Sequence, residues 1–200
     1  MQFEGIYTPV ITPFHNDGSV DKEGFAEILE FLIDVGTHGI VVAGTTGEYY
    51  AQTDEERAHL MQYAHQVING RLPMMVGVGA IRTEDSIELA QIARQTGADA
   101  LLVNSPPYVL PTETENATHA LAIDKAADLP IMLYNYPGRT GVGMGEDYLN
   151  QVSASTNFCA IKESSGDINR LHLLANDFPN IQLSCGADDQ ALEFFVWGAR

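Results

Sequence analysis

Two apolar runs, MMVGVG at residues 74–79 and ALLVNSP at residues 100–106, decide how this chain folds. Neither run alternates cleanly with polar residues, which is typical of strands that are covered on both faces of a sheet. The longer amphipathic stretch between them ends at Gly97, a residue suited to the left-handed end of a helix. Together they predict a right-handed βαβ unit with two parallel strands.

The same alternation repeats on both sides of this unit. Five further runs are candidate strands: IYTPVITPF (6–14), GIVVAG (39–44), IMLYNYP (131–137), FCAIKESS (158–165) and IQLSCGA (181–187). Helix starts are predicted by capping residues, namely Asp21, the Thr53–Glu56 pair and the Thr112–Glu115 pair. Helix ends are predicted at two further glycines, Gly36 and Gly70.

Seven such units predict an α/β fold, and two architectures are open: a doubly wound sheet or a (β/α)8 TIM barrel. The unbroken alternation, without the composition shift of a second domain, favours the barrel. A complete barrel takes about 250 residues, whereas this chain has 200 and stops at WGAR, where an eighth strand would begin. We therefore expect residues 1–200 to form one barrel domain that is incomplete at its C-terminus, a fragment with little activity alone.

Composition excludes several classes of partner. Ten basic and 27 acidic residues give a formal net charge of −17, which would repel phosphate backbones and anionic lipid. We expect no nucleic acid or membrane partner, since no window approaches the roughly 20 apolar residues of a membrane span. Cys159 and Cys185 make no disulfide framework, and no signal peptide is visible, so a cytoplasmic location is expected.

Lys162 is the one lysine that lies inside an apolar strand; the only others are Lys22 and Lys125, in polar helical stretches. By period-two alternation it shares a face with Ala160, opposite Cys159 and Ile161. Burial disfavours the charged amine, and an amine with a depressed pKa can attack a carbonyl. A structural lysine paired with a carboxylate such as Glu163 is an equally good interpretation at this point.

Polar groups at the carboxyl ends of other strands favour the catalytic interpretation, because chemistry collects at that end of a parallel sheet. Tyr134 ends the strand before that of Lys162, and a phenol near an imine can relay protons. Arg139 follows in a glycine-flanked loop and could hold a carboxylate. The turn GTTG at 44–47 offers hydroxyls and N–H groups to a small anion, although it could equally be a tight turn that uses its glycines for backbone freedom.

Four motifs occur in order on successive strand ends: GTTGE (44–48), PPY (106–108), YNYPGRTG (134–141) and IKESSGD (161–167). In this combination, which spans essentially the whole chain, the sequence resembles the dihydrodipicolinate synthase/N-acetylneuraminate lyase family. The resemblance implies a Schiff-base lyase that acts on pyruvate or a related 2-oxo acid and on an aldehyde. It also implies that no metal or organic cofactor is needed, and that the protein is a homotetramer built from dimers.

The resemblance assigns roles to individual residues. Lys162 would form the imine, and Tyr134 would shuttle protons with help from Thr45 and from Tyr108, which in the family reaches in from a neighbouring subunit. Arg139 resembles the arginine that receives the second substrate's carboxylate in the synthases, and sialic acid lyases lack it. The implied substrate-binding residues are Thr45, Thr46, Gly47 and Arg139.

Some positions depart from the synthase pattern. Tyr136 stands where typical synthases place a valine, and PPYVLP (106–111) replaces a sequence closer to TPYYNKP. A paralogue that cleaves a 2-keto-3-deoxy sugar acid, or acts as an aldolase or dehydratase on a hydroxylated 2-oxo acid, therefore stays open. Arg57 and Ile81 occupy positions that are His and Asn in lysine-inhibited members, which argues against lysine feedback.

Other classes find less support. The glycines at 77 and 79 begin a dinucleotide fingerprint, but Arg82 takes the place of its third glycine. The six histidines show no paired ligand spacing, and no G-x-S-x-G hydrolase motif occurs. A non-catalytic small-molecule-binding barrel is the alternative of a different class, and it would require neither Lys162 nor Tyr134.

Overall fold

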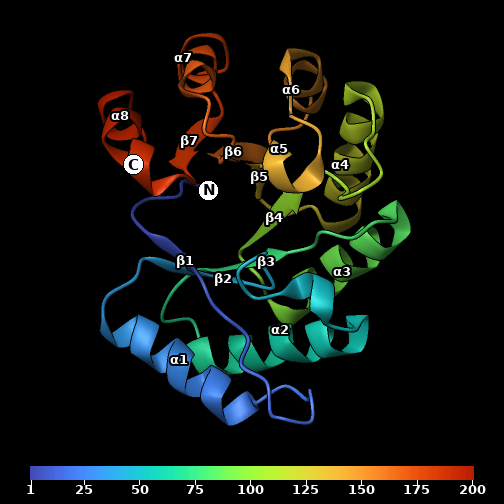
Figure 1. Ribbon diagram of the computed structural model, residues 1–200, viewed down its shortest axis with the longest axis vertical. Coiled ribbons are helices and arrows are strands. Elements are labelled where there is room, and N and C mark those ends of the chain that lie inside the picture. The colour runs from blue at the N-terminus through green and yellow to red at the C-terminus, as the bar shows by residue number, and fades with distance from the viewer.

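A computed structural model describes all 200 residues, and its centre is a curved sheet of seven parallel strands (Figure 1). The strands are β1 (Tyr7–Pro9), β2 (Gly39–Val42), β3 (Met74–Gly77), β4 (Ala100–Asn104), β5 (Ile131–Asn135), β6 (Phe158–Glu163) and β7 (Gln182–Cys185). They lie in the order β1 to β7, each hydrogen-bonded to the next, without the reversal of a doubly wound sheet. The predicted barrel is confirmed, with β1 and β7 as the two edges of an open wall.

Helices cover the outside of this wall (Figure 1). They are α1 (Lys22–Asp34), α2 (Asp54–Ile68), α3 (Thr83–Thr96), α4 (Glu113–Ala127), α6 (Glu146–Val152), α7 (Ile168–Asp177) and α8 (Ala191–Val196). The short α5 (Pro137–Thr140) lies instead near the centre, directly after β5, and the 3-10 turns are η1 (Tyr49–Ala51) and η2 (Asp188–Gln190). The Asp21 cap of α1 and the capping boxes of α2 and α4 form as predicted. None of these helices combines the length and the apolar character that a membrane span requires.

Apolar residues pack on both faces of the sheet, as the unbroken strand patterns predict. Ile40 and Val42 of β2 belong to the large core between sheet and helices, whereas Val41 between them faces the barrel interior. The interior cluster consists of Phe3, Val41, Met75, Ala100, Leu102, Met132 and Ala160. Because the interior is filled with side chains at its base, polar groups are left to gather at the carboxyl ends of the strands.

The strands are shorter than the apolar runs of the sequence. In the run 6–14 only Tyr7–Pro9 is a strand, and Pro9 and Pro13 have no N–H to donate to a ladder. Below β1 the chain crosses to the opposite edge, where the N–H of Phe3 donates to Oε1 of Gln182 in β7 at 2.9 Å. The N-terminal segment thus ties the two edges of the open wall together at its base.

One detail of β6 differs from the simple alternation. Ile131 of β5 pairs with Phe158 and Met132 pairs with Ala160, so Cys159 is an extra residue, a β-bulge. The prediction that Cys159 lies opposite Ala160 was therefore wrong: both pack towards the barrel interior. Above the bulge the alternation resumes, and Lys162 lies on the Ala160 side as expected.

Candidate active site

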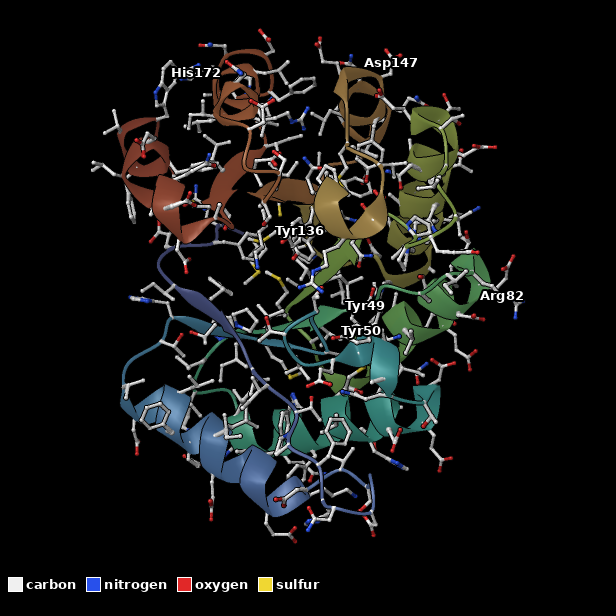
Figure 2. The ribbon with its side chains drawn as sticks, in the orientation of Figure 1. Tyr49, Tyr50, Arg82, Tyr136, Asp147 and His172 are labelled. Atoms are coloured by element: carbon white, nitrogen blue, oxygen red, sulfur yellow. The ribbon has the colours of Figure 1, made fainter.

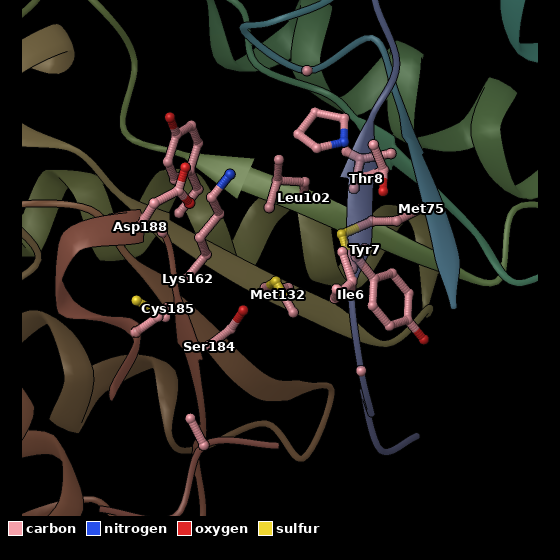
Figure 3. A pocket seen from close by; sticks show the side chains of 18 of the residues that line it. Ile6, Tyr7, Thr8, Met75, Leu102, Met132, Lys162, Ser184, Cys185 and Asp188 are labelled. Carbon is pink, nitrogen blue, oxygen red and sulfur yellow. The ribbon is translucent and has the colours of Figure 1, made fainter. Parts of the chain in front are cut away.

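A cavity of about 550 Å³ opens at the carboxyl ends of the strands, between the two edges of the wall. Figure 3 shows Lys162 extending into it, with Asp188 beside the amine and Met132 and Ser184 below. The lining residues that carry polar groups include Thr8, Thr45, Thr46, Tyr134, Lys162, Ser184, Cys185 and Asp188. Four of the predicted site residues are brought together here: Tyr134 on β5, Lys162 on β6, and Thr45 and Thr46 after β2.

Lys162 has the environment of a nucleophilic amine. Burial lowers the pKa of its ammonium below the ordinary lysine value, and the negative charge of Asp188 only partly opposes this shift. Lys22 and Lys125 are exposed, as predicted. Glu163 is not its partner, because that carboxylate binds Asn135 on the other face of the sheet. The expected alternative, in which Lys162 pairs with Glu163, is therefore wrong.

Tyr134 stands directly across the ladder from Lys162, and the amine Nζ lies 4.9 Å from the centroid of the phenol ring. Burial raises the pKa of this phenol above its ordinary value, and a hydrogen bond with the Thr45 side chain partly offsets the rise. At neutral pH the pair is thus a protonated phenol next to an amine that loses its proton more easily than usual. A proton can pass between such groups.

The turn after β2 presents two threonines to the cavity. The backbone N–H groups of Thr45 and Thr46 donate to no other group of the chain, so both are free to bind an anion. Gly47 does not offer the donor that we expected, because its N–H already donates to the carbonyl of Gly44 at 3.0 Å. A Cβ on Gly47 would lie 2.8 Å from the carbonyl oxygen of Val10, so this glycine is required for close packing.

The tight turn itself is confirmed by this Gly47–Gly44 hydrogen bond, but its glycines do not supply the unusual backbone, because neither Gly44 nor Gly47 has a positive φ. Ala43 and Glu48, which flank the turn, have φ of 54° and 55°. Left-handed conformations at residues with a Cβ cost free energy and cluster at functional sites. The strain at both ends of GTTG supports the interpretation of this turn as part of a binding site.

A second cavity of about 260 Å³ adjoins the first and shares Thr45 and Tyr134 with it. Its remaining lining is Tyr49, Tyr50, Asn104, Pro107, Tyr136, Arg139 and Thr140. Figure 2 places Tyr49, Tyr50 and Tyr136 at the centre of the molecule, whereas Arg82, Asp147 and His172 lie at its periphery. The Arg139 guanidinium is 5.8 Å from the Tyr136 ring centroid, so the one cation of this pocket is held over an aromatic face.

Tyr108 does not join the site within this chain. Its side chain is 90% exposed, it lines neither cavity, and its φ is 73°. Leu110 nearby also has a positive φ of 53°. The role of Tyr108 in a neighbouring subunit stays a prediction.

Asp188 is the site residue that sequence reasoning missed. It follows β7 in the turn η2. Of the charged groups around Lys162, its carboxylate has the largest effect on the pKa of the amine. The signal was available, because GADD comes directly after the last strand, where the carboxyl-end rule places functional groups. Thr8, the middle residue of β1, lines the same cavity.

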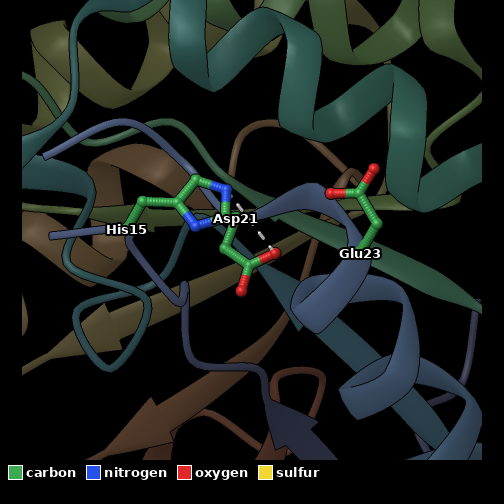
Figure 4. Close-up of side chains that lie close together, drawn as sticks. All are labelled: His15, Asp21 and Glu23. Carbon is green, nitrogen blue, oxygen red and sulfur yellow. Dashed lines mark ion pairs between the residues drawn. The ribbon is translucent and has the colours of Figure 1, made fainter. Parts of the chain in front are cut away.

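A small cluster on the far surface has the composition of a metal site. Figure 4 shows His15, Asp21 and Glu23 near the start of α1, with His15 Nε2 at 3.9 Å from Asp21 Oδ1. Asp21 Oδ1 already accepts from the N–H of Gly24 at 2.9 Å as the helix cap. Capping and a surface ion pair account for this cluster, since exposed ion pairs of this kind are common and weak.

The model of the dihydrodipicolinate synthetase family matches residues 2–200. The chain belongs to this family. A 4-hydroxy-tetrahydrodipicolinate synthase from Exiguobacterium sp. is 36% identical over 199 residues, which make up 99% of this chain and 68% of that relative. One from Stenotrophomonas maltophilia is 38% identical over 192 residues, 96% of this chain and 65% of the relative.

Members of the family also share the three-dimensional arrangement. The chloride-inhibited dihydrodipicolinate synthase from Acinetobacter baumannii, solved in complex with pyruvate, matches with a TM-score of 0.94 and 35% identity, over 99% of this chain and 68% of that one. The chain thus spans about two thirds of the length of these relatives. These matches confirm the predicted family, barrel fold and enzyme class, a pyruvate-dependent lyase.

Proposed function

We propose that Lys162 is the Schiff-base lysine of this family member and that its carbonyl substrate is pyruvate or a closely related 2-oxo acid. The observation that carries the proposal is the facing pair in the cavity, with the Lys162 Nζ 4.9 Å from the centroid of the Tyr134 ring. Burial favours the neutral amine that attack requires. The free N–H groups of Thr45 and Thr46 would hold the carboxylate of the 2-oxo acid.

The chemistry follows from these groups. The neutral amine attacks the substrate C2 carbonyl, water leaves, and a protonated imine to Lys162 remains. The imine withdraws electrons, so a proton can leave C3, and the resulting enamine carbon can add to an aldehyde. Tyr134, with the Thr45 hydroxyl beside it, would carry the protons between the carbonyl oxygen, the water that leaves and the new hydroxyl.

The second cavity would receive the aldehyde. Arg139 would bind a carboxylate on this substrate, which makes the synthase reaction with aspartate semialdehyde the first candidate. A hydroxylated 2-oxo acid, such as a 2-keto-3-deoxy sugar acid, is a second candidate. It is favoured by Asp188, whose carboxylate could accept hydrogen bonds from hydroxyls in the main cavity.

The assembly and location belong to the same proposal. Tyr108, exposed and in a left-handed conformation, would complete the proton relay of a neighbouring subunit in a homotetramer made of dimers. The two free cysteines are compatible with a reducing cytoplasm. Residues 1–200 would act as one barrel domain within this assembly.

Reduction with borohydride in the presence of pyruvate tests the imine directly. We expect the protein to gain one irreversible pyruvate adduct, and peptide mass mapping should place it on Lys162. Lys162→Ala should gain none, whereas the matched control Lys125→Ala, which removes an exposed lysine, should react like the wild type. If the wild type stays as unmodified as Lys162→Ala, the imine proposal fails and a non-catalytic binding barrel becomes the better interpretation.

The second substrate needs a separate experiment. The pyruvate-treated protein is offered aspartate semialdehyde and a series of hydroxyaldehydes, while pyruvate consumption is followed. Consumption with aspartate semialdehyde alone would support the synthase reaction. Consumption with hydroxyaldehydes, or release of pyruvate from a deoxy sugar acid, would support the aldolase instead.

A further inference from the structure

A buried polar network lies directly behind the catalytic pair, on the helix-facing side of the sheet. Asn135 and Glu163 are each 1% exposed and stand opposite each other on β5 and β6. Nδ2 of Asn135 donates to both carboxylate oxygens of Glu163, at 3.0 Å and 2.8 Å. Arg170 of α7 adds its Nε at 3.4 Å from Oε2.

The same few groups also reach the segment that carries Arg139. The N–H of Met144 donates to Oδ1 of Asn135 at 3.0 Å, and the carbonyl of Met144 accepts from Arg170 at 2.6 Å. The N–H of Ser165 donates to Oε1 of Glu163 at 2.8 Å. One network therefore joins the ends of β5 and β6, the start of α7 and the end of the loop 137–144.

The position of this network is significant because each member is a sequence neighbour of a proposed catalytic residue. Asn135 follows Tyr134 and Glu163 follows Lys162, with the side chains of each pair on opposite faces of the sheet. A slip of one residue between strands turns every side chain to the other face. The ladder between β5 and β6 already contains one irregularity, the bulge at Cys159, below these two residue pairs.

A contribution to stability does not by itself explain why the charged Glu163 carboxylate is buried behind the sheet. An apolar pair of similar volume is often as stable as a buried ion pair, or more so, because burying charge is costly. Directional hydrogen bonds, by contrast, hold one geometry. Both carboxylate oxygens of Glu163 accept hydrogen bonds, four in all.

We propose that Asn135, Glu163 and Arg170 are positioning residues, which set the Tyr134 phenol, the Lys162 amine and the Arg139 segment in their reactive arrangement. This role rests on the proposed imine chemistry of Lys162. None of the three lines either cavity, so they act through their neighbours and not on the substrate. The anion site at Thr45 and Thr46 is in the turn after β2 and outside the network.

A reversal of the Asn135–Glu163 pair tests the proposal. Asn135→Asp places two buried carboxylates together, and Glu163→Gln leaves two amide groups facing each other. The double variant Asn135→Asp with Glu163→Gln restores a donor and an acceptor with their direction reversed, and the aspartate can still accept from Met144. The measured quantities are the rate of borohydride-trapped adduct formation at saturating pyruvate and the pyruvate concentration at half-saturation, each per folded protein.

We expect each single variant to lower the saturated rate at least tenfold and to change half-saturation less than threefold, because the carboxylate site is outside the network. The double variant should recover at least a third of the wild-type rate. Asn116→Ala is the control for general destabilisation, since it removes a buried hydrogen bond to Ser105 Oγ at 2.8 Å, away from β5 and β6. It should retain the wild-type rate.

The outcomes separate the two proposals. A wild type that gains no adduct would overturn the imine chemistry, and the positioning role with it. A wild type that reacts, with single variants that react equally fast or a folded double variant no better than either, would overturn the positioning role alone. If the single variants do not fold, Arg170→Met decides the matter. It keeps the Asn135–Glu163 pair and removes the bonds of Arg170 to Met144 and to Glu163, and an unchanged rate there would refute the role.

Discussion

Replacement of Tyr134 by phenylalanine is the sharpest test of whether proton transfer depends on the Tyr134 hydroxyl, separately from amine reactivity and carboxylate binding. The change removes only the phenol oxygen and keeps the ring over which the Lys162 Nζ lies, at 4.9 Å from its centroid. The amine stays buried, so its pKa remains lowered for the same reason as in the wild type. Binding of the carboxylate at Thr45 and Thr46 does not involve the lost atom.

Two magnitudes can be compared for this variant. The loss of one hydroxyl, which interacts with the Thr45 side chain, should cost the fold about 0.5–1.5 kcal/mol, the net value of an ordinary hydrogen bond. The loss of a proton relay should slow the reaction about 10²- to 10⁴-fold, which corresponds to roughly 3–5 kcal/mol of barrier. The kinetic effect should therefore exceed the effect on stability severalfold.

The assay is a quenched time course of adduct formation with pyruvate and borohydride, combined with urea unfolding of the same preparation. Tyr63→Phe is the matched control, because Tyr63 is a half-buried tyrosine of α2 that packs on the outer core. It should react at the wild-type rate. A Tyr134→Phe protein that forms the imine within a factor of three of the wild-type rate would refute the proton-relay assignment.

Three other predictions concern buried groups. Arg57→Met should lower the free energy of urea unfolding by about 2–4 kcal/mol, because its guanidinium donates to two backbone carbonyls at 3.0 Å. Gly186→Ala should slow adduct formation, because the new Cβ would lie 1.8 Å from Ser164 Oγ and 3.0 Å from Lys162 Cε. Adding Ser164→Ala removes the first of these clashes and should restore part of the rate. Lys162→Met should stabilise the fold at pH 7, and the gain measured by urea unfolding should shrink as pH rises.

The sign of that pH dependence follows from the lowered pKa of Lys162. Between the folded pKa and the ordinary lysine value near 10.5, the unfolded chain binds more protons than the folded one, so wild-type stability rises with pH there. Below the folded pKa the full cost of burying the amine is present. A methionine at 162 does not titrate, and a gain that is constant between pH 7 and pH 10.5 would contradict a lowered amine pKa.

The elements of the fold could be predicted because their signals are local. Capping boxes specify where α2 and α4 begin, and unbroken apolar runs indicate strands that are buried on both faces. The bulge at Cys159 could not be predicted, because it depends on how β6 pairs with β5 and not on the residues of β6 alone. Period-two counting consequently failed below the bulge and succeeded above it, at Lys162.

The sequence predicted the reactive side chains of the candidate site better than it predicted the hydrogen bonds that hold their strands in place. Lys162 and Tyr134 could be found because a lone lysine and a tyrosine end neighbouring strands. Glu163 was considered only as a partner for Lys162, since its real contacts come from Asn135 and Arg170, residues 28 and 7 positions away. Hydrogen bonds of this kind depend on the tertiary fold, and no spacing rule in the sequence reports them.

The features that lower the folding stability of this protein all lie at the same end of the barrel. There the amine of Lys162 is partly buried, the turn after β2 is flanked by Ala43 and Glu48 in left-handed conformations, and the Glu163 carboxylate is enclosed behind β6. Each feature lowers stability by itself, and the two cores below hold it in place. Since the same burial that destabilises the ammonium makes the amine nucleophilic, a variant that stabilises this end of the barrel by relieving that burial should also lose reactivity.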